Sequence, residues 1–94
     1  MIHEILGDST RKVSFEDLCL ILRLTPREVY EQIALERRQG WPICAGRIKG
    51  DSGYFLGDAG DCRRQIHAIN SSIRELQQVR KSLKTTAEKM KEEP

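Results

Sequence analysis

The sequence predicts a mainly α-helical protein with a small β-hairpin and a long C-terminal helix. Two short stretches of helical spacing, 15–22 and 26–39, are separated by a break at Thr25-Pro26. Strand-forming residues then flank a connection rich in glycine and basic side chains, and the remaining chain repeats apolar residues at alternating spacings of three and four. This order of elements is that of a winged helix-turn-helix followed by a long C-terminal helix.

The composition limits the core and the number of domains. A chain of 94 residues can build one compact domain with an appended element. We expect the winged helix-turn-helix core in residues 1–57, and the long helix, with a frayed end, in 58–94. The formal charge is +2, and residues 1–57 carry as many basic as acidic side chains, so net charge by itself is no argument for a polyanionic partner.

The cysteines and the hydropathy pattern indicate where the protein resides. Cys19, Cys44 and Cys62 form an odd set without a C-x-x-C spacing, which suits a reducing compartment. The first residues are too short and too acidic for a secretory signal, and no apolar run approaches the ~20 residues that span a bilayer. We therefore expect a cytoplasmic protein with no membrane partner.

The N-terminal helices are predicted from spacing and capping residues. Isoleucines and a leucine in residues 2–6 predict a short helix that ends at Gly7 in a left-handed cap. Ser14 is the expected N-cap of the second helix, with Asp17 in its first turn. The apolar residues of this second helix are predicted to form its inner face: Phe15, Leu18, Cys19, Ile21 and Leu22.

The third helix has the clearest start signal. Thr25 is the expected N-cap, Pro26 suits the first helical position, and Gly40 is expected to close the helix. Val29 and Ile33 are predicted to face inward, together with one residue near positions 35–37.

Strand and turn signals follow the third helix. Pro42 excludes further helix, Ile43-Cys44-Ala45 and Tyr54-Phe55-Leu56 read as strands, and glycines surround Arg47-Ile48-Lys49. The expected element is a hairpin with a loose basic tip.

The C-terminal helix should begin at Asp58 or Asp61 and run to about Met90, on the order of 45 Å. Its apolar seam is interrupted only at Arg80. The seam residues are Ile66, Ile69, Ile73, Leu76, Leu83, Ala87 and Met90.

The seam could fold back on the domain or pair with a second chain. A small domain can cover only the first turns, at Cys62, Ile66 and Ile69, and the regular spacing favours a homodimer. The predicted dimer interface consists of Ile69, Ile73, Leu76, Leu83 and Ala87.

The segments Thr25-Pro26-Arg27-Glu28-Val29, Gly40-Trp41-Pro42-Ile43-Cys44 and Gly53-Tyr54-Phe55-Leu56 resemble small winged helix-turn-helix proteins of phages and prophages of Gram-positive bacteria. The resemblance covers roughly residues 14–85. It implies that 26–39 is a recognition helix and that the protein is a DNA-binding or replication-associated regulator in a bacterial host cell. The chain departs from the pattern at Glu36, where an apolar residue is expected.

Candidate DNA contacts lie on the third helix and the hairpin tip. Arg27 could bind a guanine edge or a phosphate, and Tyr30 could donate to a phosphate oxygen, whereas Glu28 and Glu31 would repel phosphates unless they accept from a cytosine amine. A solvated helix face, or one that contacts a protein, is the alternative. The predicted DNA-binding residues are Thr25, Arg27, Glu28, Tyr30, Glu31, Arg38, Arg47 and Lys49.

The expected function is sequence-specific binding of double-stranded DNA by a dimeric regulator of transcription or replication. The alternative is a protein-interaction module on the same scaffold, for example a phage protein that binds or inhibits a host protein. A purely structural coiled-coil adaptor is a third possibility. No enzyme is expected, because no nucleophile-base pair or phosphate-binding loop is recognisable. No cofactor or metal is expected either, since His3 and His67 lack partners at ligand spacing.

Overall fold

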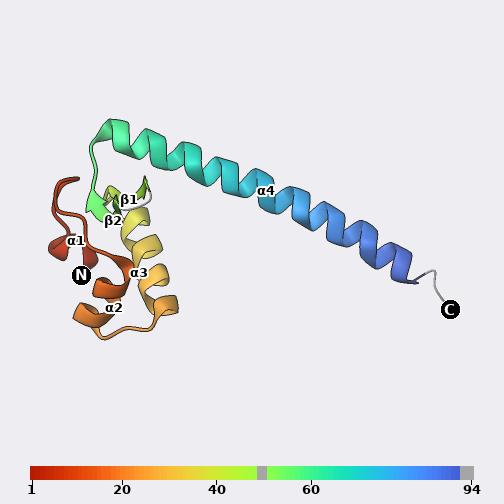
Figure 1. Ribbon diagram of the computed structural model, residues 1–94, viewed down its shortest axis with the longest axis horizontal. Helices are drawn as coiled ribbons and strands as arrows, with labels where there is room; N and C mark the ends of the chain where they lie inside the picture. The colour runs from red at the N-terminus through yellow and green to blue at the C-terminus, as the bar shows by residue number, and fades with distance from the viewer. Residues whose placement is uncertain (49–50, 92–94) are drawn as a thin grey trace.

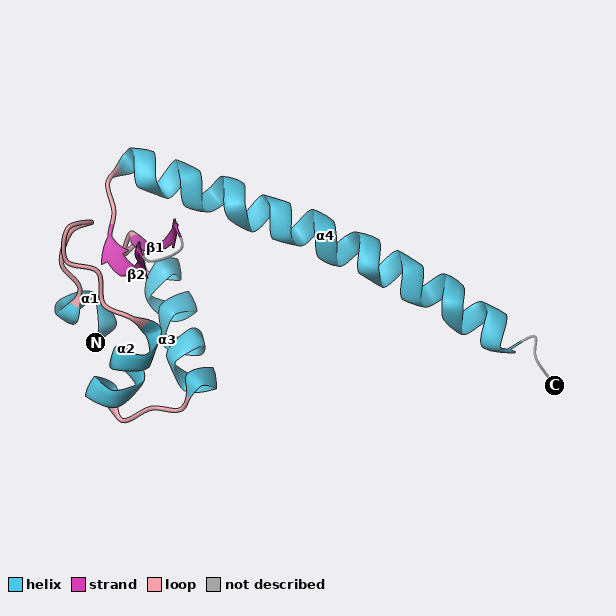
Figure 2. Ribbon diagram, in the orientation of Figure 1, coloured by secondary structure: helices cyan, strands magenta, loops and turns pink. Residues whose placement is uncertain are grey.

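The computed structural model describes residues 1–48 and 51–91, which form a small head with one long helix leaving it (Figure 1). The molecule measures 57 × 31 × 29 Å along its principal axes. Helices dominate, and the strands form one antiparallel hairpin (Figure 2). The elements, in chain order, are α1 (Ile2–Ile5), α2 (Phe15–Leu22), α3 (Pro26–Arg38), β1 (Ile43–Ile48), β2 (Asp51–Leu56) and α4 (Ala59–Lys91).

The predicted caps of α2 and α3 are confirmed. The Ser14 side chain accepts a hydrogen bond from the Asp17 amide, 3.0 Å away, at the start of α2. Thr25 and Glu28 form a reciprocal capping box at the start of α3, with Pro26 in the first turn. After α3, Gly40 adopts a left-handed φ of 102°, as expected of the residue that closes a helix.

The core lies where α1, α2, α3 and the hairpin meet. Val29 and Ile33 point inward, as predicted, and the third inward position of α3 is Glu36. The expected inner face of α2 is wrong at Ile21, which is 57% exposed, because helical rotation carries it away from α3. The buried apolar cluster consists of Ile2, Leu6, Leu18, Val29, Ile33 and Ile43.

The predicted end of α1 at a left-handed Gly7 is also wrong. The helix ends at Ile5, and Leu6 is already extended. The carbonyl of Gly7 instead accepts a hydrogen bond from the Leu56 amide at 2.8 Å. The chain after α1 therefore runs beside β2, and backbone pairing determines its conformation there.

The hairpin is longer than expected. Ile43 pairs with Leu56 and Ile48 with Asp51. Residues 46–48 and 51–53, which the sequence assigns to a loose tip, therefore continue the two strands. Ladder pairing outweighs the turn preference of Gly46 and Gly53, which lie opposite each other. Residues 49–50, at the tip, lie outside the described part of the chain.

The outer edge of β2 is covered by the segment before α2. The Val13 amide donates to the Tyr54 carbonyl at 2.9 Å, and the Tyr54 amide donates back at 2.7 Å. A side chain on Gly53 would approach Lys12 Cβ to 2.9 Å, and Gly53 has a φ of 148°, so this crossing requires glycine.

The long helix begins at Ala59, directly after Asp58, which is one of its two predicted starts, and it docks on β1. Asp58 accepts a hydrogen bond from the Asp61 amide at 2.8 Å and donates its own amide to Asp61 at 3.0 Å, which forms a reciprocal cap. Four residues on, Gln65 accepts from the Ala45 amide at 2.9 Å. Ala68 is buried.

The first turns of α4 do not bury the residues that the sequence suggested. Ile66 and Ile69 are exposed, whereas Cys62 is partly buried beside Cys44. Burial, followed by the neighbouring Cys62 thiol, raises the pKa of the Cys44 thiol to about 11. The helix contacts the hairpin through small and polar side chains, and the apolar seam of the helix faces away from this contact.

Candidate nucleic-acid interface

The predicted contact residues of α3 share its outer side. Arg27, Glu31 and Arg38 lie in one row along the helix, because spacings of four and seven residues return to the same face. The predicted α3 residues are all exposed: Thr25, Arg27, Glu28, Tyr30, Glu31 and Arg38. The structure thus exposes six of the eight predicted site residues, and three of them, Arg27, Glu31 and Arg38, share one face of α3.

Two of these residues are already engaged with each other at the first turn. Thr25 Oγ1 accepts from the Glu28 amide at 3.2 Å, and Glu28 Oε1 accepts from the Thr25 amide at 3.1 Å. These hydrogen bonds hold the pKa of Glu28 below its ordinary value. Glu28 is therefore anionic at neutral pH, and one of its carboxylate oxygens is bound to the helix start.

Arg27 is paired with an acidic neighbour on the next turn. Its Nε donates to Glu31 Oε1 at 3.1 Å, and both side chains are exposed. An exposed pair of this kind contributes little to stability. The pair orients the Arg27 guanidinium along the helix and offsets its charge.

Tyr30 extends the outer face toward α2. Its ring stacks on Phe15, with ring centroids 4.3 Å apart, and Phe15 also contacts Tyr54 of the hairpin at a centroid distance of 6.2 Å. This aromatic contact leaves Tyr30 half-exposed while its position is set by α2 and β2. A hydroxyl held this way is suited to donating a hydrogen bond to a phosphate.

A shallow hollow of about 470 Å³ lies beside the same row. Its lining combines the apolar Leu24 and Leu35 with charged side chains. The lining residues are Leu24, Glu28, Glu31, Gln32, Leu35 and Arg38. Such a mixed lining fits a protein side chain as well as a nucleic acid.

The hairpin part of the predicted site is only partly described. Arg47 belongs to β1 through its backbone, paired with Ser52. Lys49 lies outside the described residues, as does the side chain of Arg47. Their placement relative to the α3 row therefore stays a prediction.

The predicted dimer residues form an exposed stripe on α4. Leu76 and Leu83 have 67% and 64% of their surface exposed. Ile66, Ile69, Ile73, Val79 and Met90 are exposed as well. Large apolar side chains displayed in register along one helix are typical of a surface that another helix covers.

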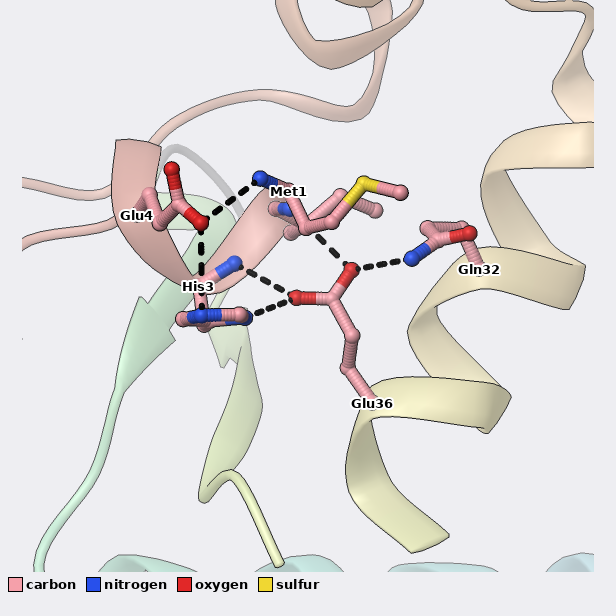
Figure 3. Close-up of polar contacts among 6 residues, drawn as sticks. Met1, His3, Glu4, Gln32 and Glu36 are labelled. Atoms are coloured by element: carbon pink, nitrogen blue, oxygen red, sulfur yellow. Dashed lines mark hydrogen bonds and ion pairs between the residues drawn. The ribbon is translucent and has the colours of Figure 1, made fainter. Parts of the chain in front are cut away.

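Sequence reasoning missed the role of Glu36. Its carboxylate is 1% exposed and accepts from the amides of Ile2 and His3 and from Gln32 Nε2, at 3.0, 2.8 and 2.8 Å (Figure 3). It also meets the His3 ring, which stacks on Trp41 at a centroid distance of 3.7 Å. The sequence feature that indicates this role is a charged residue at an inward position of α3, because a buried carboxylate needs hydrogen-bond donors from elsewhere in the chain.

Arg37 and Glu36 together anchor the end of α3. Arg37 Nε donates to the Ile43 carbonyl at 2.8 Å, which ties the helix end to β1. Arg37 therefore has a structural contact, while the side chain of Arg38 is exposed on the outer row.

Comparison with protein-family models, with curated proteins and with solved structures gives no match. Within residues 1–48 and 51–91, no cluster of His, Cys, Asp and Glu side chains could hold a metal ion. The helices described there also include none with the length and apolar character needed to cross a membrane.

Proposed function

We propose that this protein binds double-stranded DNA as a homodimer, with α3 as the recognition helix in the major groove. The observation that carries the proposal is the outer row of α3, where Arg27 and Arg38 flank Glu31 on a capped helix whose opposite face is anchored in the core. A rigid helix with protruding arginines has the geometry and chemistry to read guanine edges or to bind phosphates.

The hairpin supplies the second contact in this proposal. Arg47 and Lys49 at its distal end would bind the phosphate backbone next to the groove that α3 enters. Each neutralised phosphate adds salt-dependent affinity. The resemblance to phage and prophage proteins supports a role in regulating transcription or replication in a bacterial host.

A fluorescence-anisotropy titration on labelled duplex at two salt concentrations tests DNA binding. The triple variant Arg27→Ala, Arg47→Ala, Lys49→Ala is expected to lose at least about tenfold in affinity and to show a shallower salt dependence. The charge-matched control is Arg74→Ala, Lys81→Ala, Lys84→Ala on α4, away from the head. Equal affinity of the head variant and the wild type, or no duplex binding at low salt, would eliminate this function.

A second candidate is a protein-interaction module. The hollow that combines Leu24 and Leu35 with Glu28 and Glu31 favours it, because two carboxylates beside apolar side chains suit a basic amphipathic segment better than a phosphate backbone. Capture from a bacterial lysate after nuclease treatment separates the two candidates. A partner that persists without nucleic acid and is lost on Leu35→Asp would favour the protein module.

A further inference from the structure

The apolar stripe of α4 carries a heptad pattern with a definite assignment. Taking Ile66 as position a places Ile73 at the next a position, and Leu76 and Leu83 at d positions. β-Branched residues at a combined with leucine at d favour two parallel strands over three or four. The preference is not met at the a positions Arg80 and Ala87 or at the d positions Ile69 and Met90.

The apolar stripe of α4 is available to bind another helix, because α4 contacts its own head through other residues. Gln65 and Ala68 contact the hairpin, whereas Ile66 and Ile73 lie roughly a quarter turn or more around the helix and are exposed. The helix continues far beyond the head (Figure 1). One helix can therefore bind its head and a second helix at the same time.

We infer that α4 pairs with α4 of a second copy of this chain as a parallel, in-register, two-stranded coiled coil whose register is set by Arg80. This inference rests on the homodimer of the proposed function and adds its orientation. It does not require DNA binding.

Arg80 is the element that distinguishes the two orientations. In a parallel in-register pair, Arg80 faces Arg80 of the second copy, so both arginines occupy one layer and their long side chains can extend to water. In a fully overlapped antiparallel pair, each Arg80 faces Ile69 of the other chain. Two layers would then place a charge against an isoleucine, so the antiparallel pair would interrupt two apolar layers. The parallel pair interrupts one layer, which favours it although the two guanidinium groups repel each other there.

The flanking positions agree with the parallel arrangement. In that orientation, Ser72 neighbours Gln77 of the second copy and Val79 neighbours Lys84, without like charges. The antiparallel pair would bring Arg63 of each chain near Lys84 of the other. The antiparallel dimer would therefore place two basic side chains next to each other at each of its two ends. The parallel dimer has no such pair at its flanking positions.

Parallel pairing places both heads at the same end of the coil. The two α3 helices would then be presented together, as required for reading adjacent half-sites one helical turn apart. An antiparallel pair would separate the heads by the length of α4, which is about 50 Å for 33 residues.

A charge-swap mixing experiment on the full chain tests the register. Wild type mixed with Arg80→Glu should form heterodimers several-fold above the statistical proportion, because unlike charges would share one layer. The matched control is Gln78→Glu, at an outward position, which should mix statistically. Statistical mixing of Arg80→Glu in an established dimer would overturn the parallel register.

Disulfide trapping gives a second measurement of orientation. In a background of Cys19→Ala, Cys44→Ala and Cys62→Ala, verified as helical by circular dichroism, Leu83→Cys should cross-link rapidly with itself. A mixture of Ile66→Cys and Leu83→Cys chains should give little mixed product, because the two sites are about 25 Å apart along a parallel coil. Predominant mixed product would establish the antiparallel pair and overturn the inference.

Sedimentation equilibrium separates this inference from DNA binding. The wild-type chain should be a dimer, Ile73→Lys should be largely monomeric, and Gln78→Lys should remain dimeric. A monomeric or trimeric wild type would overturn the inference and the homodimer of the proposed function, while duplex binding by that protein would still support its DNA-binding part. A parallel dimer without duplex affinity would refute DNA binding alone.

Discussion

The Glu36 carboxylate accepts a hydrogen bond from the His3 backbone amide at 2.8 Å, which joins the last turn of the candidate recognition helix to the first residues of the chain. Glu36 also accepts from Ile2 and Gln32, so a fully buried acid is satisfied by donors from two helices (Figure 3). This arrangement fixes α3 from its inner side. The same contacts therefore also fix the position of the outward row of Arg27, Glu31 and Arg38.

Replacing Glu36 with alanine should lower the free energy of unfolding by about 2 kcal/mol, because buried donors from α1 lose their acceptor and the helix detaches. Urea denaturation followed by circular dichroism measures the effect. Glu88→Ala, on the exposed face of α4, is the matched control and should change stability by less than about 0.5 kcal/mol. Equal effects of the two substitutions would contradict the anchoring role.

Acid should weaken the same anchor. Burial is the largest influence and raises the pKa of Glu36, but the hydrogen bonds from His3, Gln32 and Ile2 together hold it below its ordinary value of 4.5. A carboxyl with a lowered pKa contributes stability above that ordinary value and loses it as pH falls through the folded-state pKa. The stability difference between wild type and Glu36→Gln should therefore shrink as the pH falls below 4.5. A constant difference would indicate that the charge of Glu36 is unimportant.

Thr25→Ala should destabilise the head by about 1 kcal/mol, because α3 loses the side-chain acceptor of its capping box. Thr25→Ser keeps the hydroxyl and should retain most of the stability. Thermal unfolding monitored by circular dichroism provides the comparison, with an expected shift of several degrees for alanine. A shift as large for serine would assign the effect to the lost methyl group.

Glu31→Gln should increase affinity for duplex DNA several-fold, since it removes an anion from the outer row and releases the Arg27 guanidinium. Anisotropy titrations at one salt concentration measure it, with Glu75→Gln on α4 as the charge-matched control. Weaker binding by Glu31→Gln would instead show that Glu31 accepts a hydrogen bond in the complex, as a carboxylate does from a cytosine amine.

Gln65→Ala should loosen the contact between α4 and the hairpin. The Ala45 amide would lose its acceptor at 2.9 Å, so its hydrogen exchange should accelerate by an amount equivalent to about 1 kcal/mol. Gln77→Ala, on the exposed part of α4, should leave that amide unchanged. Unaltered exchange in Gln65→Ala would mean that Ala68 and its neighbours hold the helix without this hydrogen bond.

Local sequence signals predicted where α2, α3 and α4 begin and where α3 ends. Ser14, Thr25 and Asp58 cap the predicted helices, and Gly40 closes α3, because each of these signals acts within a few residues of the chain. The seam of α4 was equally visible, since helical spacing assigns residues to faces without any knowledge of the fold.

Which helix faces are covered and which polar groups are paired depends on how the elements pack against one another. Gly7 follows the edge of β2 instead of a helix cap, Ile21 is turned outward, and Ala68 and Gln65 take the contact that Ile66 was expected to make. Glu36 can be buried because the backbone amides of Ile2 and His3, 34 and 33 positions away, donate hydrogen bonds to its carboxylate. Contacts between residues so far apart in the sequence depend on how the helices and strands pack. The residue pattern within one helix does not show which other element will contact it.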